Sequence, residues 1–453
     1  MFLGYNLSMN VLDEFETIAA ISTPLGTGGV GVIRISGDKA FEIIKKIFTN
    51  PNFEPRKFNH GWIVDDEKKI DEVIVLPFFA PNSYTGEDVI EIQCHGGINV
   101  VKNILNLVLK NGARMAEKGE FTKRAFLNKR MDLSQAESVA DIIHSKTSDF
   151  AKVSMKNLSG VLKEKINGIR NDIFEVLSKI TAGIDFPEDV KEPEYEYLIE
   201  SFEKTISQIK RVLADAKTSN IMRQGISVAI VGKPNVGKSS LFNALLNLDR
   251  AIVTDVAGTT RDVLRETLDL GIPVTLVDTA GIRGINKEKD KVESIGIEYS
   301  KQSLEEADLV LFVYDAVNGL NDEDKVILEL VKDKNYVMIA NKADLTDKRS
   351  GDAVYISALT GVGVNELKQT LTTKVCEVEP ENLEFVTNSR QQGCLNRAKT
   401  SIEQALMAAQ IHELQDLISI DVKSAILALD ELTGELITDE ILDNIFEHFC
   451  IGK

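Results

Sequence analysis

The chain has 453 residues, which is too long for one compact core and indicates two to four domains at about 100–200 residues each. Its composition, 43% hydrophobic and 27% charged, excludes an intrinsically disordered or collagen-like chain. A formal net charge of −18 would repel a polyanion from most of the surface. Any nucleic-acid contact is therefore expected to be a local patch or to be made by a partner.

No apolar stretch approaches the roughly 20 residues needed to span a bilayer, and no Lys or Arg precedes the weak apolar run at the N-terminus. We therefore expect a cytoplasmic protein without membrane insertion, starting at Met1 or Met9. The four cysteines lack C-x-x-C spacing and are expected to be free thiols in a reducing compartment. They are Cys94, Cys376, Cys394 and Cys450.

Proline and apolar spacing divide the chain into regions. Short β-branched runs bounded by Gly, Pro and Asn predict four strands in the first region, at 17–22, 30–36, 72–79 and 89–93. Long helices are expected where proline is missing, between Pro81 and Pro187 and after Pro380, with apolar residues at helical intervals. Those residues are Ala140, Ile143 and Phe150 in the first reach, and Ile402, Leu406, Ala409, Leu417 and Ile420 in the second.

Between about Gln224 and Val378, strands alternate with helix-like stretches, a pattern that predicts an α/β domain with a mainly parallel sheet. The expected strands are 227–231, 274–277, 309–313 and 336–339. Because a compact domain whose ends lie close together can be inserted into another, we expect this domain to sit inside a helical domain whose two halves pair across it.

A phosphate-binding loop follows the first of these strands. Residues 232–239 read GKPNVGKS, the G-x-x-x-x-G-K-[ST] pattern between a strand and a helix. Backbone N–H groups are expected to wrap the phosphates, Lys238 to reach the terminal phosphates and Ser239 to bind Mg²⁺. A glycine-rich turn without a ligand is the weaker interpretation in this context.

Three more segments follow in the order typical of a GTPase. Asp278-Thr279-Ala280-Gly281 ends a strand and places a carboxylate near the metal. In the segment at 341–344, NKAD, the carboxylate of Asp344 can accept hydrogen bonds from N1–H and the 2-amino group of guanine. Ser357-Ala358-Leu359 completes the base pocket, so the four segments together predict a GTP site.

The loop at 255–262 is the candidate switch, and Thr260 is the candidate Mg²⁺ ligand within it. Where Ras-like enzymes carry a glutamine that orients water, this chain has Ile282, so another group must assist hydrolysis. Three alternatives are open: a carboxylate within 286–298, Arg261 as an internal finger, or a monovalent cation beside Asn235.

The residues of these motifs resemble the MnmE (TrmE) family of tRNA-modification GTPases. The resemblance rests on the phosphate loop, on Gly258-Thr-Thr-Arg-Asp262 and on the terminal Phe449-Cys-Ile-Gly-Lys453, and it extends to Thr85-Gly-Glu-Asp88 and 121–127. It implies a multidomain α/β protein: an N-terminal α+β folate-binding and dimerisation domain (1–130), a helical domain (131–223 and 380–453) and an inserted Ras-like P-loop G domain (224–379).

The resemblance also implies the activity. A K⁺-stimulated GTP hydrolase would add a carboxymethylaminomethyl or aminomethyl group at C5 of the wobble uridine, position 34, of certain tRNAs. It would form a homodimer and act with an FAD-dependent subunit like MnmG (GidA) in a heterotetramer. The implied cofactors are GTP, Mg²⁺, K⁺ and 5-formyl- or 5,10-methylene-tetrahydrofolate.

Site residues follow from the same resemblance. The implied K⁺ ligands are Asn235, Thr254, Val256 and Thr259, and the implied Mg²⁺ ligands are Ser239 and Thr260. The implied folate-binding residues are Arg34, Glu91, Arg130 and Lys453. Glu293, with Glu288 as its competitor, sets up the attacking water, and Cys450 is required for modification. The expected GTP contacts are Asn235, Val236, Gly237, Lys238, Ser239, Ser240, Thr254, Asp255, Val256, Ala257, Gly258, Thr259, Thr260, Asp278, Thr279, Ala280, Gly281, Asn341, Lys342, Ala343, Asp344, Ser357, Ala358 and Leu359.

Other interpretations of the first region and the C-terminus are weighed on the residues alone. The run at 26–31 matches G-x-G-x-x-G but leads into a strand, so a turn is favoured over a dinucleotide site. Arg34 and Glu91 are each expected on the strand face opposite their isoleucine neighbours. Cys450 suits neither prenylation nor a zinc site with Cys94, His95 and His448, which leaves a buried structural thiol as the default.

A basic run is the local cationic patch nearest the expected folate site. A solvated helix face and a contact with tRNA or cofactor fit it equally well. Its members are Lys118, Lys123, Arg124, Lys129 and Arg130. For the whole chain, the alternative to the enzyme is a non-enzymatic GTP-dependent switch that assembles on ribosome or tRNA, which would need neither the folate residues nor Cys450.

Overall fold

The computed structural model describes residues 16–55, 57–248, 265–278, 306–347, 349, 351–376 and 379–453. Two compact units form, one from Met1–Ala140 with Thr433–Lys453 and one from Asp141–Leu432. The predicted fold class, a multidomain α/β chain with a helical domain and an inserted P-loop domain, is confirmed. The predicted domain boundaries stay predictions, although residues from Thr433 onward pack with the N-terminal region.

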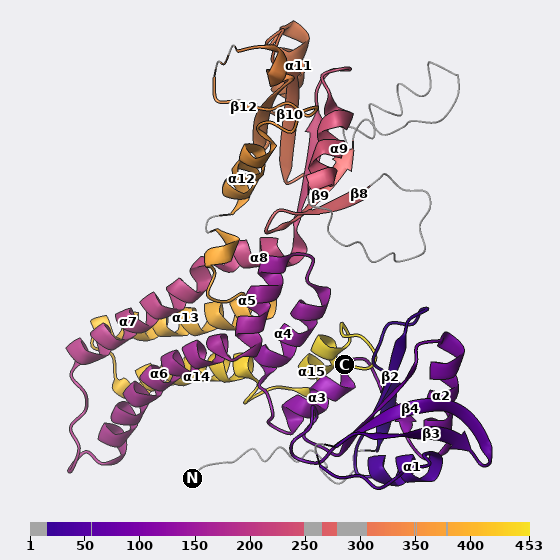
Figure 1. Ribbon diagram of the computed structural model, residues 1–453. Coiled ribbons are helices and arrows are strands. Elements are labelled where there is room, and N and C mark those ends of the chain that lie inside the picture. The colour runs from indigo at the N-terminus through magenta and orange to yellow at the C-terminus, as the bar shows by residue number, and fades with distance from the viewer. Residues whose placement is uncertain are drawn as a thin grey trace. The chain divides into compact units, whose positions relative to one another are not determined.

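The first unit is built on a six-stranded sheet in the order β3-β4-β5-β2-β1-β6 (Figure 1). All neighbours are antiparallel except β1 and β6. The four predicted strands are present, whereas β3 and β6 were not predicted. The strands are β1 (Ile18–Ile21), β2 (Val30–Ser36), β3 (Asn59–Asp65), β4 (Lys68–Phe78), β5 (Val89–His95) and β6 (Arg114–Met115).

The two faces of this sheet are covered by different helices. On one face Ile33, Ile35 and Ile92 pack with α1 (Ala40–Ile47) and α2 (Ile98–Lys110) in a buried apolar core. On the other face Ile18 and Ala20 pack with Phe121. The helices α3 (Glu120–Leu127) and α15 (Asp439–Phe446), from opposite ends of the sequence, share a cluster with the start of α4 (Leu133–His144). Period-2 alternation along β2 and β5 therefore places Arg34 and Glu91 on the face that the C-terminal segment approaches.

In the second unit four long helices form a bundle with one buried core (Figure 1). These helices are α6 (Val161–Asp185), α7 (Tyr195–Ala214), α13 (Ser389–Gln410) and α14 (Gln415–Thr433). The halves before and after the α/β insertion thus pair, as the sequence predicts. In α14 the buried face is Ile418, Val422 and Ala425, while Leu417 and Ile420 of the expected apolar pattern are exposed. The turn after Gln410 resets the helical phase, which is why spacing counted across it selects the wrong face.

The α/β part has a six-stranded sheet in the order β12-β11-β10-β7-β9-β8, parallel except for β8 against β9. The four predicted strands are present, and β8 and β12 were not predicted. The strands are β7 (Ile226–Val231), β8 (Arg265–Asp269), β9 (Pro273–Asp278), β10 (Leu309–Asp315), β11 (Tyr336–Asn341) and β12 (Val354–Tyr355). The described helices beside it are α9 (Lys238–Leu248), α11 (Asp322–Val331) and α12 (Val364–Val375), with short turns η1 (Ala343–Leu345) and η2 (Pro380–Asn382).

The core of the α/β part includes residues from outside the predicted insertion. Phe150 and Val153 of α5 (Ser148–Leu158) and Met222 of α8 (Ala216–Gln224) are buried in the same apolar cluster as residues of the strands. Leu383 and Val386, just after η2, join the same cluster. The inserted sheet therefore packs on α5 and α8 through apolar side chains. Removal of a buried α5 side chain is expected to lower the stability of the sheet.

Phe150→Ala is expected to lower the free energy of opening of β7 and β10 by about 3–5 kcal/mol, because a fully buried aromatic side chain leaves a cavity. Native-state amide hydrogen exchange of these strands measures that loss directly. The matched control is Phe174→Ala on α6, where the ring is 51% exposed and the change should be below about 1 kcal/mol. Unchanged exchange in β7 after Phe150→Ala would contradict the shared core.

Candidate functional site

The phosphate loop joins β7 to α9 and depends on its glycines. Gly232 has a φ of +152°, and a Cβ at that position would lie 2.2 Å from the carbonyl oxygen of Val313. Gly237 has a φ of +95°, and its Cβ would lie 2.2 Å from Nδ2 of Asn341. Only glycine fits at both positions, so the loop can adopt this backbone conformation only because the motif has glycine there. Asn235 lies at the loop tip in the left-handed region, with a φ of 63°.

Lys238 and Ser239 are the first two residues of α9, so both are presented at a helix N-terminus. The Lys238 ammonium donates to the carbonyl oxygens of Gly232 and Lys233, each at 2.8 Å, and is thereby held across the loop. Lys233 forms an ion pair of 2.9 Å with the buried Asp324 of α11. The loop is therefore braced from both sides in the conformation that anion binding by backbone N–H groups requires.

Asn341 joins the phosphate loop to the predicted base-reading segment. Its buried amide Nδ2 donates to the carbonyl oxygen of Val236 at 2.9 Å, and its Oδ1 accepts from the backbone N–H of Ala358 at 3.0 Å. A further link, 2.9 Å long, runs from the N–H of Ala343 to the carbonyl oxygen of Ile356. The structure thus brings the segments at 235–240, 341–344 and 357–359 together, as the sequence predicts.

Within that base-reading segment, Asp344 and Leu359 are exposed, whereas Ser357 is buried. Lys342 has a φ of 64° and forms an ion pair of 2.8 Å with Asp315 at the end of β10. Burial raises the pKa of Asp315, but the hydrogen bonds from Lys342 and from the backbone of Val317 outweigh it, so the pKa is lowered. A charged Asp315 fixes Lys342 and, through it, the backbone from which the side chain of Asp344 projects.

Several predicted residues lie outside the described part of the chain. Between β9 and β10 these are Thr279, Ala280, Gly281, Ile282, Glu288 and Glu293. In the candidate switch they are Thr254, Asp255, Val256, Ala257, Gly258, Thr259, Thr260 and Arg261. Of Asp278, only the backbone at the end of β9 is described. The assignments of switch, K⁺ and attacking water therefore stay predictions.

A second group of predicted residues meets on the sheet of the first unit. Arg34 on β2 lies directly opposite Glu91 on β5 in the antiparallel register. Nε and Nη2 of Arg34 both reach Oε1 of Glu91, at 2.9 and 2.8 Å. The two side chains are 12% and 21% exposed, so the pair is partly shielded from water. Among the described residues no donor contacts Oε2 of Glu91, which can accept from a ligand.

The C-terminal residues return to this pair. Ile451 forms an antiparallel bridge with Lys118, and the backbone N–H of Phe121 donates to the backbone oxygen of Lys453 at 3.2 Å. Gly452 has a φ of +94° and its Cβ would lie 2.3 Å from the carbonyl oxygen of Ile21, so glycine alone permits this approach. Its own carbonyl oxygen lies 3.5 Å from Nη1 of Arg34. The tail is therefore part of the site and not an appendage.

Lys453 is half-buried beside these groups. Burial and the neighbouring Arg34 guanidinium lower the pKa of its ammonium, against the opposing influence of Glu91 and Cys450. Arg130 completes the predicted set: its guanidinium carbon is 5.3 Å from the centre of the Tyr84 ring, and the guanidinium carbon of Arg34 is 5.0 Å from the same ring. The ring of Phe121 also faces Arg34, at 5.5 Å.

Two residues of this region were not predicted from the sequence, Tyr84 and Ser22. The hydroxyl of Ser22 donates to the carbonyl oxygen of Gly452 at 3.3 Å. A signal for Tyr84 existed, since it immediately precedes the Thr85–Asp88 segment that carries the family resemblance. Two other interpretations of this region are wrong. Cys450 is exposed and not a buried structural thiol. Arg124 of the basic run is 2% exposed and paired with Glu87 and Glu120, so it belongs to the core.

The zinc alternative also receives no support. Cys94 is buried and donates to the carbonyl oxygen of Gly31, while His95 pairs with Asp71 at 2.7 Å. In the described ranges no group of three or more His, Cys, Asp or Glu residues is placed to hold a metal. Those ranges also contain no helix long and apolar enough to cross a bilayer.

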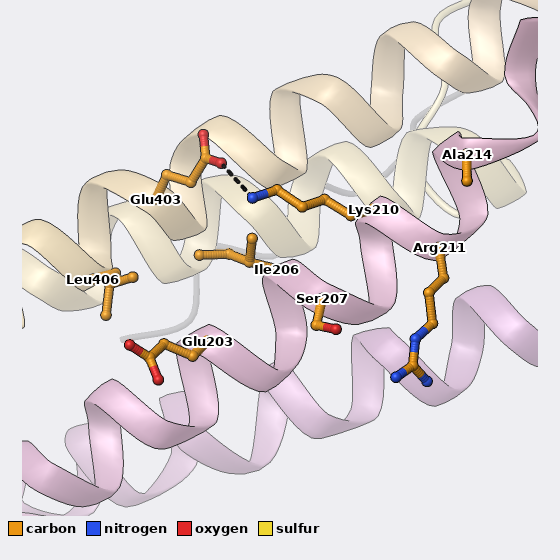
Figure 2. A pocket seen from close by; sticks show the side chains of 8 residues that line it. All are labelled: Glu203, Ile206, Ser207, Lys210, Arg211, Ala214, Glu403 and Leu406. Atoms are coloured by element: carbon orange, nitrogen blue, oxygen red, sulfur yellow. Dashed lines mark ion pairs between the residues drawn. The ribbon is translucent and has the colours of Figure 1, made fainter.

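The helical bundle carries a hollow of about 540 Å³ between α7 and α13, and none of the residues that line it is a predicted site residue (Figure 2). Two acidic and two basic side chains are among the residues that line it, and Lys210 reaches Glu403 at 4.0 Å. Because its charges neutralise one another across an open helix–helix groove, this hollow offers no converging set of groups for a nucleotide or folate.

Comparison with known proteins gives consistent matches along the chain. Residues 17–130 match the family model described as GTP-binding protein TrmE N-terminus, and residues 133–450 match MnmE helical domain. Proteins named tRNA modification GTPase MnmE are similar over nearly their full length. That of Desulforamulus reducens is 44% identical over 97% of this chain and 99% of its own. Those of Lactococcus lactis and Thermotoga maritima are 43% and 42% identical, over 98% and 97% of this chain and all of theirs.

Gly237→Ala is expected to weaken GTP binding by about tenfold or more, because an added Cβ would force Asn341 away from Val236 and strain the loop backbone. Titration with a fluorescent guanine nucleotide measures the loss. Gly168→Ala on α6 is the matched control: no atom lies within 4 Å of its added Cβ, so affinity should not change. Equal affinities of the two variants would show that the described loop is not the nucleotide site.

Proposed function

Since this chain belongs to the MnmE family of tRNA modification GTPases, we propose that its GTP hydrolysis is K⁺-stimulated and drives modification of the wobble uridine of certain tRNAs with a folate one-carbon unit. The product would carry a carboxymethylaminomethyl or aminomethyl group at C5 of uridine 34. The chain would act as a homodimer, bound to an FAD-dependent subunit in a heterotetramer. GTP hydrolysis itself belongs to the family.

The observation that carries the folate part is the mainly basic cluster of side chains made by residues 34, 91, 130 and 453. Three of its four members are basic, in a chain whose net charge is −18. Oε1 of Glu91 accepts both Arg34 nitrogens, which leaves Oε2 for the donor edge of a pterin. Arg130 would take a carboxylate at the other end of the ligand, while the Lys453 ammonium, beside Arg34 and Glu91, would contact its ring end. A reduced folate, with a donor-bearing ring and an anionic tail, fits this donor set.

The metal sites of the nucleotide are supported by loop chemistry. Ser239 begins α9 beside Lys238, where its hydroxyl would hold Mg²⁺ against the phosphates. The left-handed Asn235 at the loop tip would hold K⁺ with the predicted ligands 254, 256 and 259. The cation would supply the positive charge that an arginine finger supplies in other GTPases. Glu293 would then orient water, and Cys450, exposed on the tail, would serve the modification step.

The alternative, a GTP-dependent assembly switch without chemistry of its own, accounts for the phosphate loop alone. It gives no reason for a tail whose backbone is fastened next to Arg34 and Glu91 by several contacts. A switch would also leave the half-buried Lys453 ammonium without a purpose, since desolvating a cation costs free energy. The enzyme is therefore the better account.

GTP turnover is expected to be about 100-fold faster in K⁺ than in Na⁺ at equal ionic strength, because a dehydrated cation beside the transferred phosphoryl group stabilises its developing charge. Steady-state phosphate release measures both rates. Asn235→Ala should abolish the difference, whereas Asn396→Ala, an exposed asparagine of α13, should preserve it. Equal rates of GTP turnover by the wild type in both salts would refute a catalytic role of K⁺ and would favour Arg261 as the internal arginine finger.

A further inference from the structure

One aromatic ring contacts two of the basic residues of this cluster. The centre of the Tyr84 ring is 5.0 Å from the guanidinium carbon of Arg34 and 5.3 Å from that of Arg130. Arg34 comes from β2, whereas Arg130 follows the end of α3. The separation of the two guanidinium carbons therefore cannot exceed the sum of these distances.

The ring is itself held in place. Its hydroxyl lies 2.9 Å from Oγ1 of Thr122, a fully buried residue of α3. The next residue, Thr85, is buried and its hydroxyl is 2.7 Å from that of Ser36 on β2. Asn128 donates to the carbonyl oxygen of Thr85 at 2.8 Å. The loop that carries Tyr84 is thus tied to β2, to α3 and to the segment that leads to Arg130.

The two guanidinium groups differ in what else holds them. Arg34 is paired with Glu91 and faces Phe121 as well. Arg130 is exposed, and in the described part of the chain it has no carboxylate partner. A long exposed side chain loses rotamer entropy when a ligand immobilises it, and a ring that already restrains it reduces that loss. The negative face of an aromatic ring attracts a guanidinium at these distances.

We propose that Tyr84 is a positioning residue that holds Arg34 and Arg130 as a fixed pair for an extended anionic ligand with a planar, donor-bearing end. This proposal rests on the proposed function, which identifies that ligand as a reduced folate. Tyr84 acts through the two arginines: its aromatic face orders them, while its hydroxyl only anchors the ring. The aromatic face, and not the hydroxyl, therefore determines affinity.

Isothermal titration of the full chain with 5-formyl-tetrahydrofolate tests this division. Tyr84→Leu keeps an apolar side chain but removes the aromatic face, so the dissociation constant should rise about tenfold. Tyr84→Phe keeps the face and should stay within about twofold of the wild type. The control is Tyr195→Leu in the helical bundle, a tyrosine stacked on His412. It should leave folate affinity unchanged, and thermal unfolding reports whether each variant folds.

A double-mutant cycle identifies the route. If Tyr84 acts by holding the two arginines as a pair, adding Tyr84→Leu to Arg130→Gln should weaken binding by less than the tenfold loss that Tyr84→Leu causes alone, because one of the two cations that the ring orders is already gone. Full additivity of the two changes, wild-type affinity in Tyr84→Leu, or a tenfold loss in Tyr84→Phe would each overturn the assignment. A wild type that binds no 5-formyl-tetrahydrofolate would instead refute the proposed folate use, and the role of Tyr84 with it.

Discussion

The backbone contacts that fasten the last four residues to the start of α3 and the segment before it are the constraint on which the candidate one-carbon site depends. Lys118 bridges Ile451, and Phe121 donates to the backbone oxygen of Lys453, so the tail occupies one fixed register beside α3. Gly452 permits this course because any side chain there would collide with Ile21. Residues more than 400 positions apart in the sequence thereby become neighbours of Arg34, which no local sequence pattern specifies.

The second unit shows the same dependence on distant parts of the chain. Phe150 of α5 and Val386 before α13 complete the apolar core under the parallel sheet, although each lies outside the predicted G domain. Asn157 of α5 donates to the carbonyl oxygen of Val386 at 2.7 Å and holds these two flanking segments together. Because the sheet and these helices share one apolar core, a substitution that destabilises either part is expected to destabilise the other.

Local motifs predicted much of this arrangement. The phosphate loop, the parallel strands and the opposite faces of Arg34 and Ile33 follow from spacing and strand periodicity, which depend only on neighbouring residues. Arg124 shows the limit: its sequence neighbours suggest a basic patch, but Glu87 and Glu120 enclose it in the core. The exposed Leu417 and the aromatic contacts of Tyr84 were missed for the same reason, because helix phase and packing are set by tertiary contacts.

The tail is expected to form part of a modification site that is separate from the site of GTP hydrolysis. The most direct measurement compares wobble nucleosides, by mass spectrometry, in cells that carry the full chain or a version lacking Cys450–Lys453, with GTP turnover of both purified proteins. The account predicts retained GTP hydrolysis and loss of the C5 modification, since Arg34 loses its neighbours Gly452 and Lys453. Modification at the normal level in the truncated protein would contradict it and make the tail a structural cap.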